Sequence, residues 1–229
     1  MTAPRRLGNP RLHLRVTDST SDRARALAIA GAPHGTLVTA GEQRAGRGRH
    51  GRTWSAPPGR ALLMSLVLHE PPALLALASA VAVADVVGPE AAIKWPNDVL
   101  VAGRKVAGIL AEGRPPAQWV VLGIGVNVTV REEDLPPELA GRATGLGLGP
   151  GDVERVLAAL LPALERRLGE EPATTLAAYR ERDALRGREV RWHHGSGVAA
   201  GIDGDGRLLV DRPDGDRVAL DAGEVHLTR

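Results

Sequence analysis

The most informative part of this sequence is Lys94-Trp95-Pro96-Asn97-Asp98, followed closely by Lys105-Val106-Ala107-Gly108-Ile109-Leu110. Of the 29 lysines and arginines in the chain, only Lys94 and Lys105 are lysine. Lysine presents a compact ammonium with three rotatable donors, whereas arginine presents a planar fork, so the two do not replace one another at a specific site. A chain that uses arginine almost everywhere else therefore indicates a site here that needs the ammonium.

Most of the other scarce polar residues also lie in a few short stretches of the sequence. Asparagine occurs three times and glutamine twice. Asn97 follows the first lysine, Asn127 ends the stretch Gly123-Ile124-Gly125-Val126-Asn127, and Gln43 opens a loop rich in glycine and arginine. Four short stretches thus hold most of the residue types that this composition otherwise avoids. We interpret them as parts of one site.

The composition restricts the class of protein. At 229 residues with 43% hydrophobic residues, the chain can form one large domain and a small one. The absence of cysteine excludes disulfides, thiolate metal sites and cysteine nucleophiles. The formal charge of +2 is too small to indicate nucleic-acid binding, although the pI is 9.6. No apolar stretch is long enough to span a bilayer, and no secretory signal is visible, so a cytoplasmic protein is expected.

Hydrophobic periodicity predicts an α+β fold with a mixed or mainly antiparallel sheet and helices packed on one face of it, because several strands follow one another without helices between them. The strands are expected at residues 11–16, 35–40, 61–68, 91–95, 98–101, 105–112 and 119–128. Helices are expected at residues 20–28, 71–87, 153–168 and 172–185, the third capped by Asp152 and kinked at Pro162. Short strands after Gly187 predict a small five-stranded barrel, which divides the chain into domains 1–186 and 187–229.

The loop that begins at Gln43 contains a misleading motif. Gly46, Gly48 and Gly51 match G-x-G-x-x-G, but a dinucleotide fingerprint must open a helix, and Pro57-Pro58 forbid one soon after. Glycine backbone and arginine side chains instead suit an anion. A plain solvated loop or an RNA-binding patch is the alternative interpretation.

The candidate residues suit one kind of chemistry. No nucleophile elbow or metalloprotease motif is present, and the adjacent His193-His194 would face opposite sides of a strand, so a shared metal is not expected. Cations and neutral amides instead suit a reaction between two anions, which repel by about 4 kcal/mol at 4 Å and an effective dielectric near 20. Attack of a carboxylate on a nucleoside triphosphate is such a reaction, and a closing loop would protect the product from water.

Together, the four stretches resemble the signature motifs of biotin protein ligases. The resemblance rests on residues 46–54, on 94–98, on 105–110 and on 123–127, which occur in the order typical of that family. It implies a catalytic domain related to class II aminoacyl-tRNA synthetases, followed by an SH3-like barrel. It also implies synthesis of biotinyl-5′-AMP from biotin and MgATP, then transfer of biotin to one lysine of a biotin carboxyl carrier domain of acyl-CoA carboxylases.

The resemblance also assigns residues. Lys105 would bridge the biotin carboxylate and the α-phosphate, Trp54 would pack near the adenine, and Asp98 would hold the turn between Lys94 and Asn97. Ser21 stands where the family usually has asparagine. Mg²⁺ would sit mainly on the ATP phosphates, so no protein ligand for a metal is named. The biotin site would comprise Ser19, Thr20, Ser21, Gln43, Arg47, Gly48, Arg49, Lys105 and Gly108; the ATP site Arg49, Trp54, Lys94, Asn97 and Asn127; the catalytic residues Lys105, Arg47 and Arg49.

Three alternatives stay open at this stage. A lipoate-type ligase would use the same chemistry on another acid. A non-enzymatic RNA-binding protein would need stacking aromatics on the barrel, which supplies only Trp192. A sensor that retains biotinyl-AMP without transferring it is the third. Few residues precede the first motif, so no DNA-binding module is expected, nor is a membrane partner; a homodimer is compatible with the resemblance.

Overall fold

The computed structural model describes residues 6–113, 118–149, 151–221 and 225–227. Seven strands form one mixed sheet in the order β1-β2-β5-β9-β8-β7-β6. Only β1 and β2 pair in parallel; every other pair in this sheet is antiparallel. The predicted mixed sheet is therefore confirmed. Its strands, in spatial order, are β1 (Arg11–Leu14), β2 (Leu37–Ala40), β5 (Ala61–His69), β9 (Trp119–Asn127), β8 (Arg104–Glu112), β7 (Asp98–Val101) and β6 (Ala91–Lys94).

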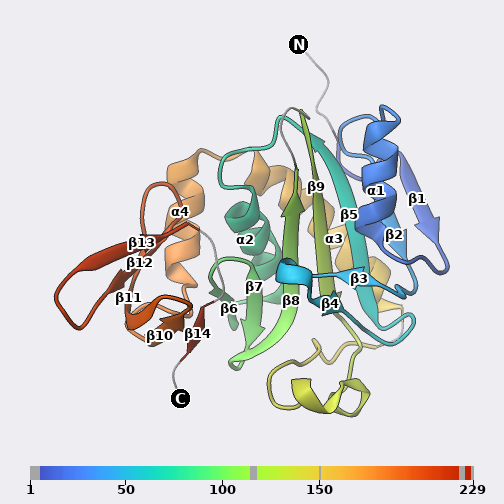
Figure 1. Ribbon diagram of the computed structural model, residues 1–229. Coiled ribbons are helices and arrows are strands. Elements are labelled where there is room, and N and C mark those ends of the chain that lie inside the picture. Colours follow the sequence, from blue (N-terminus) through green and yellow to red (C-terminus); the bar gives the residue numbers. More distant parts are fainter. Residues whose placement is uncertain (1–5, 114–117, 150, 222–224, 228–229) are drawn as a thin grey trace.

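Helices cover both faces of this sheet, though unequally, so the expectation that they pack on one face alone is wrong (Figure 1). α1 (Thr20–Ile29) packs on one face against β2, β5 and β9. α2 (Leu75–Val87) and α3 (Asp152–Leu168) cover the opposite face, and α4 (Pro172–Glu181) packs on α2. Successive side chains of β5 point to opposite faces of the sheet, so both faces have an apolar core. Leu66 belongs to the core with α2 and α3, whereas Val67 packs under α1. Beyond α1, the first face is left for a site.

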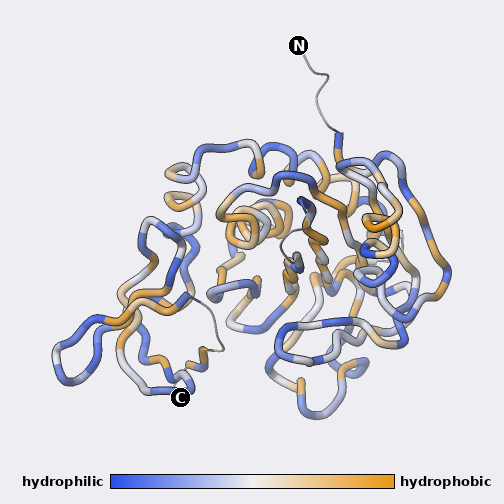
Figure 2. Tube along the Cα trace, turned by 45° about the horizontal axis from the view of Figure 1, so that its top comes forward, coloured by the Kyte–Doolittle hydropathy of each residue, from blue (hydrophilic) through white to orange (hydrophobic). Residues whose placement is uncertain are grey.

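The core is aliphatic, as the composition predicts. α2 is buried along nearly its whole length, which requires apolar residues all round the helix. Figure 2 shows this helix in orange near the middle of the molecule, whereas the outer loops are mostly blue or white. Among the described residues, no helix combines the length and the apolar character needed to cross a bilayer.

A second sheet follows the helices. It contains β10 (Glu189–Trp192), β11 (Gly195–Ile202), β12 (Leu208–Asp211), β13 (Arg217–Leu220) and β14 (His226–Leu227). The strands are antiparallel in the order β13-β12-β11-β10-β14, which confirms five short strands. Within the described residues no ladder joins β13 to β14, so hydrogen bonds do not close this sheet into a barrel there. The boundary at residues 186 and 187 stays a prediction.

The two sheets are connected by specific contacts. The indole Nε1 of Trp95 donates to the carbonyl of Gly206 across 3.0 Å. The backbone of β6 also continues the main sheet toward the C-terminal strands, because Ile93 N donates to Arg182 O at 2.7 Å and Ala184 N donates to Ile93 O at 3.0 Å. These contacts place the motif at residues 94–98 beside the second sheet.

Several helix and strand ends differ from the prediction. Gly151 is the N-cap of α3, and Asp152 is its first residue, whose carboxylate accepts from Gly149 N at 2.8 Å. The prediction that Asp152 caps the helix is therefore wrong by one position. α3 runs through Pro162 as a single helix. Other ends also differ, the largest shifts being that β1 stops at Leu14, β2 starts at Leu37, α2 starts at Leu75 and α4 stops at Glu181.

His193 and His194 lie in the turn between β10 and β11, not on a strand. Their rings pack edge to face with centroids 4.4 Å apart, so the expectation that they face opposite sides is wrong. No cluster of three or more potential metal-ligating side chains occurs among the described residues, here or elsewhere.

Candidate functional site

Glycines form the floor of a cleft on the face of the sheet that α2 and α3 do not cover. Gly125 of β9 lies opposite Gly108 of β8, and Gly108 lies opposite Asp98 of β7. Asp98 in turn lies opposite Lys94 of β6. Directly paired residues share a face of a sheet, so this cross-strand row places two charged side chains beside a floor without side chains.

Trp54 lies on that glycine floor. It belongs to the hairpin of β3 (Gly46–Arg47) and β4 (Thr53–Trp54), which crosses in front of β8 and β9 (Figure 1). A Cβ at Gly108 would lie 3.0 Å from the indole Cζ3, and one at Gly125 would overlap the same ring. Trp54 therefore approaches the sheet backbone closely at both glycines. Its indole Nε1 is buried, with no hydrogen-bond partner among the described residues.

The cleft has a volume of about 780 Å³. Every residue that the resemblance assigned to the site lines it except Ser19, which is buried and caps α1 by accepting from Asp22 N at 3.4 Å. The structure therefore brings together residues from α1, the hairpin and the segment before it, the turn before β7, and three strands of the sheet, β6, β8 and β9. The predicted residues that line the cleft are Thr20, Ser21, Gln43, Arg47, Gly48, Arg49, Trp54, Lys94, Asn97, Lys105, Gly108 and Asn127.

One wall was not predicted. Six residues of the segment 135–143 line the cleft, and so do His226 and Leu227 of β14; the six are Leu135, Glu138, Leu139, Gly141, Arg142 and Ala143. The first segment is held by backbone pairing to the catalytic candidate itself: Lys105 N donates to Arg142 O, and Thr144 N donates to Lys105 O, both at 2.9 Å. Asn127 adds a bond from its Nδ2 to the carbonyl of Thr144 at 3.1 Å. Pairing between distant segments leaves no local pattern, so the sequence carried no signal for this wall.

Lys105 has two close partners in the cleft. Its Nζ lies 2.6 Å from Asp98 Oδ1 and 5.5 Å from the ring centroid of Trp54. Asp98 also pairs with Lys94 across the turn, in the ladder of β6 with β7, so its expected role in that turn stays a prediction. Asn97 ties the turn to β8, because its Nδ2 donates to the carbonyl of Ile109 at 2.7 Å.

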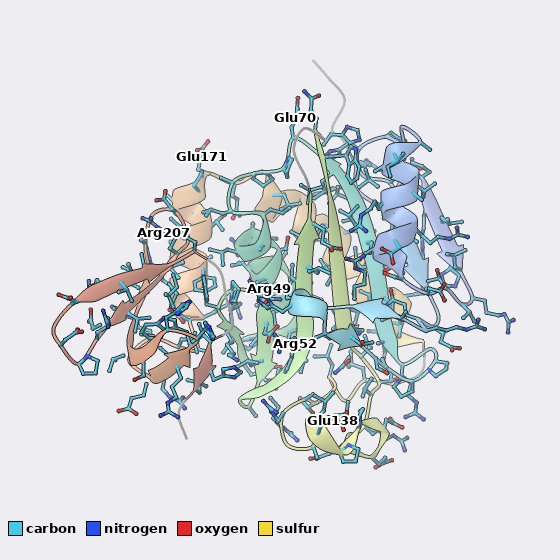
Figure 3. The ribbon with its side chains drawn as sticks, in the orientation of Figure 1. Arg49, Arg52, Glu70, Glu138, Glu171 and Arg207 are labelled. Atoms are coloured by element: carbon cyan, nitrogen blue, oxygen red, sulfur yellow. The ribbon has the colours of Figure 1, made fainter. Side chains whose placement is uncertain are left out.

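The arginine loop is held at both ends. Arg47 bridges two carboxylates, since its Nη1 lies 2.8 Å from Asp22 and its Nη2 lies 2.8 Å from Glu112. Arg49 extends toward the other side, where its Nη1 donates to Asn97 Oδ1 at 3.3 Å. Figure 3 shows Arg49 and Arg52 in front of the main sheet on the side of β7 and β8, with Glu138 on the separate segment below them. No α-helix follows the glycines, so the rejection of a dinucleotide fingerprint is confirmed.

The charge of the lining favours an anion. Its cations come from the hairpin, β6, β8 and the unpredicted wall, and among the described lining residues Asp98 and Glu138 supply the carboxylates. Arg47 also pairs with Asp22 and Glu112, which do not line the cleft. Such a lining strengthens the binding of a polyanion, because the cations neutralise part of the polyanion's charge in a cleft that is partly shielded from bulk water. The cations are Arg47, Arg49, Arg52, Lys94, Lys105 and Arg142.

Comparison with protein families agrees with this site. Residues 13–127 match the model described as the Biotin/lipoate A/B protein ligase family. Residues 187–227 match the Biotin protein ligase C terminal domain. The first match contains every residue assigned to the site from the sequence.

Individual relatives and structures agree with the family match. The chain is 39% identical to the biotin--[acetyl-CoA-carboxylase] ligase of Mycobacterium tuberculosis, over 91% of this chain and 85% of that one. It is 37% identical to the ligase of the same name from Paracoccus denitrificans, over 91% and 97%. The biotin protein ligase from Aquifex aeolicus in complex with biotin and ATP superposes with a TM-score of 0.82 at 28% identity, covering 96% of this chain and 99% of that one.

Proposed function

Because this chain belongs to the biotin protein ligase family of enzymes, we propose that it activates biotin as biotinyl-5′-AMP and transfers the biotinyl group to one lysine of a biotin carboxyl carrier domain. The observation that supports this most directly is the position of Lys105. It is one of two lysines in the whole chain, and its ammonium lies in a cationic cleft beside a tryptophan on a glycine floor. A carboxylate and a triphosphate can meet there with their repulsion reduced.

The first half-reaction is an in-line displacement. A carboxylate oxygen of biotin attacks the α-phosphorus of ATP, the bond from that phosphorus to the bridging oxygen of the β-phosphate breaks, and pyrophosphate leaves with the electron pair. The Lys105 ammonium would neutralise charge on the carboxylate and the α-phosphate as they approach. No general base is needed, because the nucleophile is already ionised at neutral pH.

In the second half-reaction, the uncharged amine of the acceptor lysine attacks the biotinyl carbonyl carbon. The bond to the AMP oxygen breaks, AMP leaves with the electron pair, the nitrogen loses one proton to solvent, and an amide forms. Until the acceptor arrives, water must be kept from the mixed anhydride. The β3–β4 hairpin lies over the glycine floor and is the element positioned to do this.

The nucleotide would occupy the side of Trp54, Lys94, Asn97 and Asn127. The indole offers an aromatic face on which an adenine ring could stack. Mg²⁺ would arrive on the ATP phosphates, in keeping with its preference for phosphate oxygens and retained water.

The decisive experiment is pyrophosphate release with biotin and MgATP in the absence of an acceptor, together with mass detection of biotinyl-AMP. A burst near one equivalent is expected, because the intermediate stays bound. Addition of a biotin carboxyl carrier domain should then discharge it onto one lysine. Release of pyrophosphate with lipoate but not with biotin would identify a lipoate-type ligase instead. No release with either acid would contradict the ligase proposal.

A further inference from the structure

A buried serine that the sequence motifs did not include lies behind the cleft. Ser65 is on β5, opposite Gly123 of β9, and its side chain is 0% exposed. It faces the N-terminus of α1, where Thr20 and Ser21 are also buried but line the cleft. Ser65 itself does not line the cleft, so any influence on a ligand must act through its neighbours.

The hydrogen bonds in this cluster have only one consistent direction. Gln43 accepts from the backbone N–H of Thr20 at 2.7 Å, which identifies the accepting atom as the amide oxygen. The Thr20 hydroxyl lies 2.9 Å from the same oxygen and must donate to it. The Thr20 proton is therefore committed, so Ser65 donates to Thr20 Oγ1 at 2.9 Å.

The direction of the hydrogen bond between Ser21 and Ser65 follows from the number of hydroxyl protons. Ser21 Oγ lies 3.1 Å from Ser65 Oγ. A hydroxyl has one proton, and that of Ser65 already goes to Thr20, so Ser21 must be the donor. The protons run in one direction, from Ser21 to Ser65 to Thr20 to Gln43.

This direction sets what the cleft offers to a ligand. The hydroxyl protons of Ser21 and Thr20 both point into the protein, which leaves their oxygen lone pairs as the groups available to the cleft. Gln43 has its oxygen occupied and keeps its Nε2–H donors. This end of the cleft therefore suits a group that combines N–H donors with a carbonyl acceptor.

We propose that Ser65 is a positioning residue that orients the hydroxyls of Thr20 and Ser21 as acceptors and so selects for the cyclic urea of biotin. The inference rests on the proposed function. A cyclic urea supplies two N–H donors and one carbonyl, whereas the dithiolane ring of lipoate supplies no N–H at all. With lipoate the lone pairs would lose their water without gaining a donor, which disfavours that ligand.

The test compares Ser65→Ala with Ser79→Ala in the full-length protein. Ser79 on α2 is also 0% exposed, but its hydroxyl donates to Leu75 O at 2.7 Å, and it does not line the cleft. We expect S65A to raise the KM for biotin in pyrophosphate release at least tenfold, while kcat at saturating biotin falls less than threefold. S79A should lose comparable thermal stability with no change in the KM for biotin.

A second measurement separates orientation from general loosening of the fold. Biotin methylated at one or the other ureido nitrogen lacks one N–H. We expect wild-type protein to bind at least one isomer tenfold more weakly than biotin, and S65A and Ser21→Ala to reduce that penalty at least threefold. Should S65A be too unstable to purify, Ser65→Cys keeps the size with a weak donor and takes its place.

The outcomes are distinct from those that test the ligase proposal. Wild-type protein that forms biotinyl-AMP, together with an S65A variant whose KM and methyl penalty match wild type, would leave the proposed function standing and overturn the role of Ser65. Wild-type protein that binds neither biotin nor MgATP would overturn both. A raised KM for biotin in S79A equal to that in S65A would also overturn the inference, because burial alone would then explain the effect.

Discussion

The ammonium of Lys105 lies 2.6 Å from the carboxylate of Asp98, on the neighbouring strand. A register shift between Val99 and Leu100 accompanies the pairing of β7 with β8, and both charged side chains line the cleft. The side chains of both residues are partly exposed, at 33% and 22%, so water still reaches the pair. An incoming carboxylate or phosphate therefore competes with Asp98 for a cation that is already positioned.

Lys105→Ala should lower the rate of adenylate formation by at least a hundredfold while biotin still binds, because the variant removes charge neutralisation at the reacting atoms and leaves the ureido end intact. Single-turnover pyrophosphate release and calorimetric biotin binding measure the two effects. Arg104→Ala is the matched control: Arg104 is adjacent on β8, pairs with Glu132 at 3.4 Å and does not line the cleft. Wild-type turnover in the Lys105 variant would contradict the assigned role.

Arg47→Gly should release biotinyl-AMP early, because Arg47 joins the hairpin to Asp22 on α1 and to Glu112 on β8. These ion pairs are partly exposed, so their loss should cost at most about 1 kcal/mol of stability. The expected sign is labelling of exposed lysines on a bystander protein, with little change in melting temperature. Arg131→Ala, which removes an exposed pair with Glu133, is the control. Full retention of the adenylate by the Arg47 variant would show that these ion pairs do not hold the hairpin over the bound adenylate.

Gly125→Ala should displace Trp54 from the cleft floor, because the added methyl would overlap the indole ring. We expect the KM for MgATP to rise about tenfold, equivalent to about 1.4 kcal/mol, with a smaller effect on the KM for biotin. Gly204→Ala is the control, since a Cβ there meets no atom within 4 Å and its φ lies outside the positive region. Equal effects on both substrates would argue against a nucleotide-side role for Trp54.

The sequence predicted what depends on local pattern. The strands and helices follow from periodicity, and the rarity of lysine pointed to Lys94 and Lys105. The sequence did not predict that Asp98 pairs with Lys105, because that contact depends on a register shift between two strands. Ser65 was missed for a related reason: a serine in the apolar run of β5 carries no motif, and its importance depends on α1 folding over it. The wall at residues 135–143 is held by backbone pairing with Lys105. Such pairing between distant segments leaves no local sequence pattern, so this wall could not be predicted either.

Asp183→Asn should stabilise the protein at neutral pH. Asp183 Oδ2 and the hydroxyl of Tyr179 are buried without hydrogen-bond partners among the described residues. Burial raises the pKa of Asp183, against the opposing effect of backbone N–H groups such as that of Leu185. Burial, reinforced by the nearby Asp183, likewise raises the pKa of Tyr179.

The sign of the effect follows from the raised pKa. The folded protein holds the proton of Asp183 more tightly than the unfolded chain does, so stability falls as pH rises from the ordinary aspartate pKa, about 3.9, through the raised folded value, and stays lower above it. Asparagine is uncharged at every pH and keeps an oxygen to accept from Leu185 N, which lies 2.9 Å from Asp183 Oδ1. The variant should therefore gain about 1 kcal/mol in urea unfolding at pH 7, and less near pH 4. Glu133→Gln, at an exposed carboxylate, should show no such dependence. A gain equal at both pH values would mean that packing, rather than the buried charge, separates the two proteins.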